Sequence, residues 1–82
     1  MIDDKTKELI AVGAAITANC QPCLEYHAAK AGELGAAAED ILAAVEVGKQ
    51  VRRGAAAKMD RYAERQVGGR NVPEPPPGCD CR

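Results

Sequence analysis

Apolar residues recur at three- and four-residue steps along most of the chain, which is the spacing of amphipathic helices. The first stripe consists of Leu9, Ile10, Gly13 and Ile16. Asp3 or Asp4 is placed to cap this helix, which we expect to run to about Thr17. The period-two alternation that marks strands is absent. The sequence therefore predicts an all-α fold.

A second helix follows directly. Asn19 interrupts the first helix, and Pro22 suits the first turn of the next, where its missing N–H is no loss. The second stripe consists of Leu24, His27, Ala28 and Ala31. Gly32 or Gly35 then provides a natural C-terminal stop.

Two more helices are expected after this glycine pair. The third begins near Ala37 or Ala38, with the carboxylates of Glu39 and Asp40 complementing its N-terminal dipole. Its predicted inward residues are Ile41, Leu42, Val45 and Gly48. The segment "RRG" at 52–54 predicts a break or kink. The inward stripe predicted for the fourth helix is Ala55, Met59, Tyr62, Ala63 and Val67. The chain thus predicts a small bundle of about four helices that contains a helical hairpin.

The character of the sequence changes at Gly68. Residues 68–82, "GGRNVPEPPPGCDCR", hold four of the five prolines and no helical stripe. We interpret residues 1–67 as one helical domain and residues 68–82 as an extended tail that carries Cys79 and Cys81.

Composition limits what one copy of this chain can bury. The 82 residues include no Phe, no Trp and two Tyr, and alanine supplies much of the 46% apolar content. A core of such small side chains gains little hydrophobic stabilisation against chain entropy, so we expect an oligomer. Gly13 and Gly48 fit close approaches between helices.

The charge pattern excludes several classes of partner. A net charge of −1 with interspersed signs indicates neither a nucleic-acid surface nor a membrane surface. The one basic cluster, Lys49, Arg52 and Arg53, is interpreted as a solvated helix end. The N-terminus has no secretory signal pattern, so we expect a cytoplasmic protein. Reducing conditions there favour redox chemistry or metal binding for the four cysteines over permanent disulfides.

The candidate chemistry lies at the start of the second helix, in the pattern Cys20-x-x-Cys23-x-x-x-His27. Residues four apart share a helix face, so the ring of His27 can lie near the sulfur of Cys23. Unpaired N–H groups at a helix N-terminus stabilise a thiolate. Such a thiolate can attack an oxidant, become a sulfenic acid, and be resolved as a disulfide by its partner.

Glu8 lies twelve residues before Cys20. With it, the chain resembles the alkylhydroperoxidase-D-like redox branch of the carboxymuconolactone decarboxylase superfamily over roughly residues 6–67. By this resemblance Cys23 attacks the peroxide and Cys20 resolves the intermediate, while Glu8 and His27 relay protons. We expect Glu8 to reach His27 through a water.

The resemblance also implies what the protein works with. It implies a thiol-dependent peroxidase or disulfide oxidoreductase that uses no metal or organic prosthetic group. The reductant would be an external thiol partner, such as a thioredoxin-like or lipoyl protein, and the assembly a homotrimer or homohexamer. Strongly active members often carry a second histidine immediately before the second cysteine. Here that position is Pro22, which implies weaker activity.

Three other interpretations stay open at this point. Cys20, Cys23 and His27, completed by Cys79 or Cys81, would form a Cys₃His zinc site. The two neighbouring cysteines could instead form a structural disulfide, although so small a loop stabilises little. The chain could also be a helical assembly module whose cysteines have no chemical role.

Overall fold

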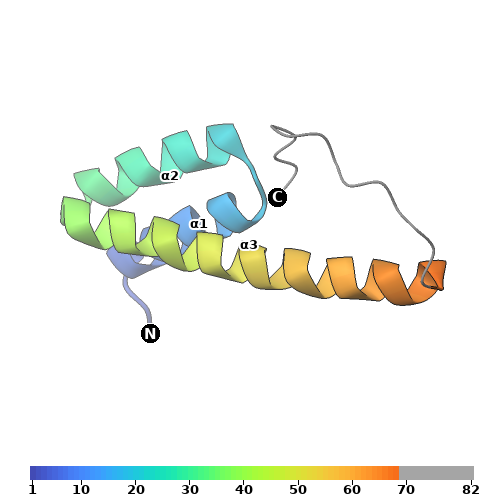
Figure 1. Cartoon of the computed structure of the whole chain (residues 1–82). Coiled ribbons are helices and arrows are strands. Elements are labelled where there is room, and N and C mark those ends of the chain that lie inside the picture. Colours follow the sequence, from blue (N-terminus) through green and yellow to red (C-terminus); the bar gives the residue numbers. More distant parts are fainter. Residues whose placement is uncertain (69–82) are drawn as a thin grey trace.

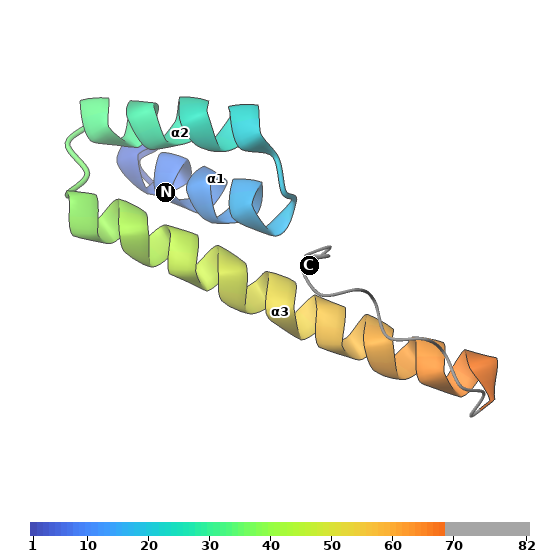
Figure 2. The ribbon, with the colours of Figure 1, turned by 45° about the horizontal axis from the view of Figure 1, so that its top comes forward.

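The structure is a computed structural model, and it describes residues 1–68. These residues form three helices, α1 (Asp4–Thr17), α2 (Gln21–Glu33) and α3 (Ala38–Val67), and no strand. The prediction of an all-α fold is confirmed. Figure 1 shows α1 and α2 beside the first half of α3, while the second half of α3 projects beyond them (Figure 2). The predicted tail after Gly68 lies outside the described residues.

Local signals account for the ends of α1. The carboxylate of Asp3 caps the helix by accepting a hydrogen bond of 2.8 Å from the backbone N–H of Thr6. This hydrogen bond from the Thr6 backbone lowers the pKa of Asp3 below its ordinary value. At the other end, Asn19 adopts a left-handed backbone with φ of 56°, which asparagine tolerates better than most residues. The chain therefore turns sharply between α1 and α2.

Helix α1 is the centre of the fold. It contacts both α2 and α3, whereas these two make few contacts with each other. The fully buried apolar side chains among residues 1–68 are Val12, Ala15 and Ala31. Val12 and Ala15 come from α1 and Ala31 from α2. The core is as small as the alanine-rich composition predicts.

Glycine allows α1 and α3 to approach closely. A Cβ added at Gly48 would lie 2.8 Å from the Cβ of Ile16 and closer still to the carbonyl oxygen of Gly13. The hydroxyl of Thr17 lies at the same crossing, 3.1 Å from the carbonyl oxygens of both Gly13 and Gly48. The prediction that these two glycines serve a close helix contact is confirmed.

The predicted break at residues 52–54 is wrong, because α3 runs without interruption from Ala38 to Val67. The arginines and alanines around Gly54 are good helix formers, and one glycine in a long helix costs only about 1 kcal/mol. The predicted third and fourth helices are therefore one helix.

The predicted inward face of the last helix also needs correction. Met59 is 64% exposed and Tyr62 is 52% exposed, and Ala55 and Ala63 are exposed as well. This part of α3 lies beyond α1 and α2, so no other helix of the described chain covers it (Figure 2). Leu42, also expected to be inward, is 60% exposed. None of the helices in residues 1–68 combines the length and the apolar character that a membrane crossing requires.

Candidate functional site

Cys20 and Cys23 lie at the N-terminus of α2 and are joined by a disulfide. Cys20 is the N-cap residue and has an extended backbone, while Cys23 lies in the first turn of the helix. Pro22 stands between them at the start of the helix, where its missing N–H leaves no intrahelical hydrogen bond unmade. The two Cα atoms are 5.3 Å apart, inside the range of roughly 4.4–6.8 Å in which disulfides form.

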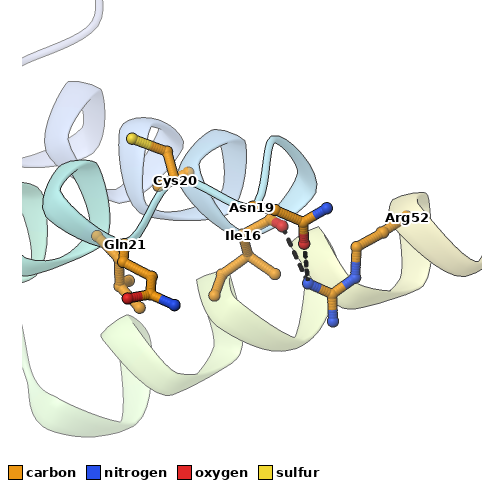
Figure 3. A pocket seen from close by; sticks show the side chains of 7 residues that line it. Ile16, Asn19, Cys20, Gln21 and Arg52 are labelled. Atoms are coloured by element: carbon orange, nitrogen blue, oxygen red, sulfur yellow. Dashed lines mark hydrogen bonds between the residues drawn. The ribbon is translucent and has the colours of Figure 1, made fainter. Parts of the chain in front are cut away.

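The two cysteines differ in their surroundings. Cys23 is exposed, whereas Cys20 is half-buried. Cys20 lines an open pocket of about 200 Å³ at the junction between α1 and α2 (Figure 3). The wall of this pocket includes Ile16 from α1, Asn19 from the junction and Arg52 from α3. Solvent therefore reaches the pair at Cys23, whereas Cys20 borders the pocket.

Glu8 and His27 form a direct contact between α1 and α2. The Nδ1 atom of His27 lies 2.8 Å from Oε1 of Glu8. Both side chains are partly buried, with 19% of Glu8 and 31% of His27 exposed. The expectation that a water would connect them is wrong, because the shared α1–α2 interface brings the two groups within hydrogen-bond distance.

This contact determines how the imidazole can act. A carboxylate is an acceptor, so the Nδ1–H group of His27 donates to Glu8. In the neutral ring, Nε2 then keeps its lone pair and can accept a proton. The ring of Tyr26 meets that of His27 edge to face, with centroids 5.0 Å apart, which adds a second contact to the imidazole. The arrangement suits a histidine that takes up and returns protons.

The structure thus brings the four motif residues together as two pairs. Glu8 contacts His27, and Cys20 is bonded to Cys23. Helix α2 connects the pairs, because His27 follows Cys23 by one helical turn. The disulfide-bonded cysteines at the N-terminus of α2 are therefore followed, one turn further along the helix, by an imidazole that a carboxylate orients.

A comparison with protein families gives this arrangement a context. The family model described as "Carboxymuconolactone decarboxylase family" matches residues 1–64, which include α1, α2 and most of α3. The chain belongs to the carboxymuconolactone decarboxylase family. The match covers all four motif residues, and the superfamily named from their spacing is confirmed.

The chain is also similar to a curated protein whose name refers to its gene locus. "Uncharacterized protein 4 in cox locus" from Paracoccus denitrificans is 42% identical over 55 residues, which cover 67% of this chain. The same residues cover 50% of the relative, so the chain spans about half the length of the curated relative it matches. No solved structure matches the chain significantly.

This family member also has a contact at the junction that the sequence did not reveal. Arg52 donates hydrogen bonds to the carbonyl oxygen of Ile16 and to the side chain of Asn19. From the sequence, Arg52 is expected at a solvated helix end, and Asn19 is expected only to interrupt the first helix. The expectation for Arg52 is wrong, because α3 continues past residue 52 and the Arg52 side chain is half-buried against the junction. Asn19 does interrupt the helix, since α1 ends at Thr17, and its side chain also accepts a hydrogen bond from Arg52. The signal in the sequence that could have indicated this contact is the asparagine immediately before the first cysteine, since its side-chain oxygen can accept a hydrogen bond.

The zinc alternative has no support among the described residues. No group of three His, Cys, Asp or Glu side chains within residues 1–68 is close enough to hold a metal ion. Cys20 and Cys23 are in the disulfide form, in which neither sulfur is a thiolate ligand. Cys79 and Cys81, the other ligands considered for this site, lie outside the described residues.

Proposed function

We propose that this protein is a thiol-dependent peroxidase or disulfide oxidoreductase of the alkylhydroperoxidase-D-like branch. In this proposal Cys20 and Cys23 cycle between dithiol and disulfide. The observation that carries the proposal is the combination of a Cys20–Cys23 disulfide with an imidazole oriented by a carboxylate, His27 on Glu8, one turn along the same helix.

The oxidative half of the cycle uses one peroxide. The Cys23 thiolate attacks one peroxide oxygen, the O–O bond breaks, and an alkoxide or hydroxide leaves and takes up a proton. Cys23 is then a sulfenic acid. The thiolate of Cys20 attacks its sulfur, hydroxide leaves and is protonated to water, and the disulfide forms. Two electrons pass from the two thiols to the peroxide, so no metal or prosthetic group is needed.

His27 and Glu8 move protons in this scheme. The neutral imidazole takes the thiol proton of Cys23 through Nε2 and returns a proton to the leaving oxygen. Glu8 holds the proton of the ring on Nδ1 and stabilises the imidazolium that forms transiently. Pro22 cannot transfer protons, and we therefore propose a modest peroxidase rate.

The reductive half needs an external thiol. We propose a thioredoxin-like or lipoyl-bearing partner whose dithiol becomes a disulfide as Cys20 and Cys23 are reduced. We also propose a homotrimer or homohexamer in the cytoplasm, where reducing conditions sustain such a cycle. The exposed apolar side chains Met59 and Tyr62 on α3 support a surface that other subunits cover.

Thiol titration tests the proposed function. The experiment uses the double variant Cys79→Ser/Cys81→Ser, so that the reduced protein contains only two thiols, those of Cys20 and Cys23. One equivalent of peroxide should consume both thiols rapidly, and dithiothreitol should restore them. Thiols that persist after one equivalent of peroxide would contradict the proposed peroxidase activity.

Single replacements test the roles of the two cysteines. Cys20→Ser should leave a Cys23 sulfenic acid that mass spectrometry detects after trapping, and Cys23→Ser should abolish the fast reaction. Zinc is measured on the full-length wild type, because the alternative site needs Cys79 or Cys81. Stoichiometric zinc that is lost equally from both single variants would favour the metal site instead.

A further inference from the structure

A guanidinium on α3 holds the junction that precedes the redox pair. The Nη1 atom of Arg52 lies 3.2 Å from the carbonyl oxygen of Ile16 and 2.7 Å from Oδ1 of Asn19 (Figure 3). One cationic nitrogen thus donates hydrogen bonds both to the last turn of α1 and to Asn19, just after the helix. Hydrogen bonds from a charged donor are among the stronger ones in proteins.

The junction determines where Cys20 lies. Asn19 is directly bonded to Cys20 and is the one non-glycine residue with a positive φ within residues 1–68. The backbone N–H of Cys20 donates to the carbonyl oxygen of Ala15 at 3.0 Å, which closes the turn on α1. Because Asn19 and Cys20 share a peptide bond, a change in the backbone of Asn19 moves the Cα of Cys20 relative to α2.

Arg52 has no competing partner of opposite charge in the part of the chain that the structure describes. The ion pairs there join other residues, and the acceptors of Arg52 are neutral oxygens of the junction. Arg53, its neighbour in sequence, is exposed, and its side chain forms no hydrogen bond or ion pair among residues 1–68. Arg53 is therefore a suitable control for Arg52, because it carries the same charge but does not contact the junction.

Arg52 reaches the redox pair through the backbone and not through the sulfur. Figure 3 shows the sulfur of Cys20 directed away from the guanidinium, while the side chain of Asn19 points toward it. Arg52 is accordingly a positioning residue, because the hydrogen bonds of its guanidinium go to oxygens of the junction and not to a reacting sulfur.

We propose that the hydrogen bonds of Arg52 to Ile16 and Asn19 stabilise the Cys20–Cys23 disulfide relative to the dithiol. This inference rests on the proposed dithiol–disulfide cycle. In the reduced protein no disulfide joins the cysteines, and two features then favour the 5.3 Å Cα separation of the disulfide form. One is the first turn of α2, where the Leu24 N–H donates to the carbonyl oxygen of Cys20, and the other is the junction, which sets the backbone of Cys20 against α1. Restricting the thiols to this geometry raises their effective concentration toward each other, which favours disulfide formation.

The reduction potential tests the inference. Arg52→Gln and Arg53→Gln are made in the Cys79→Ser/Cys81→Ser background, and each is equilibrated with mixtures of reduced and oxidised glutathione. Arg52→Gln should make the disulfide about tenfold easier to reduce, which corresponds to a potential about 30 mV less negative. Arg53→Gln removes the same charge and should leave the potential unchanged. A residue with a merely structural role would destabilise both redox forms equally and would also leave the potential unchanged.

A second variant tests the acceptor side and covers the case in which Arg52→Gln does not fold. Asn19→Gly keeps a residue that tolerates positive φ and removes Oδ1. It should shift the potential in the same direction as Arg52→Gln, and the double variant should shift it by less than the sum of the single shifts. Potentials equal to that of the parent protein in Asn19→Gly, or equal in Arg52→Gln and Arg53→Gln, would overturn the inference.

Failure of this inference can be told from failure of the proposed function. The glutathione equilibrium contains no peroxide, so it measures only how the hydrogen bonds of Arg52 affect the reduction potential. If peroxide oxidises the parent protein but the potentials of Arg52→Gln and Arg53→Gln do not differ, the hydrogen bonds of Arg52 have no redox role. The peroxidase proposal then stands. If peroxide leaves the parent dithiol unchanged, the proposed peroxidase activity fails whatever the potentials are.

Discussion

The two halves of α3 differ in whether other helices pack against them. The first half belongs to a core region, residues 4–52, in which α1 contacts both of its neighbours and Val12 is completely buried. The second half is a distal segment, residues 53–67, in which Met59 and Tyr62 remain more than half exposed. Both halves are helical. The pattern of apolar residues can therefore predict a helix without predicting what covers it.

The candidate site lies entirely in the core region. Glu8, Cys20, Cys23 and His27 belong to α1, α2 and the junction between them, and Arg52 is the last residue of the core region. The distal segment contributes no residue to the contacts of the site. Changes in the core region should thus alter chemistry and stability, and changes in the distal segment should alter assembly.

The largest effect should come from the proton-transfer pair. His27→Ala removes the imidazole, and Glu8→Gln removes the carboxylate that accepts from Nδ1. Each should slow disulfide formation by peroxide by about 10²- to 10⁴-fold, as the loss of a proton-transfer group does. Stopped-flow measurement of thiol loss gives these rates. The matched control is Glu64→Gln in the distal segment, where the side chain is exposed and the rate should not change.

The second effect compares two helical glycines of α3. Gly48→Ala places a Cβ against Ile16 and the backbone of Gly13, so α1 and α3 must separate. The free energy of unfolding should fall by about 1–3 kcal/mol, which is typical of overpacking. Urea denaturation followed by circular dichroism measures this change.

Gly54→Ala is the control for that experiment in the distal segment. A Cβ at Gly54 meets nothing within 4 Å, and alanine is a better helix former than glycine. This variant should be more stable than the wild type by about 0.5–1 kcal/mol. A similar loss of stability in both variants would mean that the two halves of α3 are equally covered.

Local signals made much of the fold predictable from the sequence. The ends of α1, the proline in the first turn of α2, and the close approach at Gly13 and Gly48 follow from rules that concern neighbouring residues or small side chains. The prediction of a break at residues 52–54 was wrong, because good helix formers on both sides of Gly54 keep α3 continuous.

The site was predictable only in part. The spacing of Glu8, Cys20, Cys23 and His27 selected these residues, but their direct contacts depend on how α1 packs against α2. The bond between Arg52 and Asn19 spans 33 positions and involves no shared periodicity. Such contacts depend on the crossing of α1 and α3, which hydrophobic spacing alone does not determine.

A smaller effect on fold stability is expected from the exposed apolar residues of the distal segment. Met59→Ser and Tyr62→Ser should change the unfolding free energy of an isolated subunit by less than about 0.5 kcal/mol, as exposed substitutions do. Their effect should instead be on assembly. Sedimentation velocity should show a shift of the double variant to smaller species, whereas Lys58→Ser on the same helix should sediment like the wild type. An assembly unchanged in the double variant would place the subunit contacts elsewhere.

The smallest effect concerns how α1 and α3 begin. Asp3 caps α1 through Thr6, whereas the N-cap of α3, Ala37, makes no side-chain hydrogen bond. The hydrogen bond from the Thr6 backbone lowers the pKa of Asp3 from its ordinary value of 3.8. A lowered pKa in the folded state means that the charged cap stabilises the fold above the unfolded-state pKa. This contribution is lost as the pH falls through the lowered folded-state pKa.

Asp3→Ala should therefore reduce the urea midpoint slightly at pH 7, and the difference from wild type should shrink as the pH falls below 3.8, the ordinary pKa of the Asp3 carboxyl. Asp3→Asn keeps a good cap that does not titrate, so its difference from Asp3→Ala should stay constant over the same range. Other carboxylates titrate alike in all three proteins and cancel in these differences. A wild-type advantage over Asp3→Ala that persisted unchanged to pH 2 would show that the side chain of Asp3 caps α1 equally well without its charge.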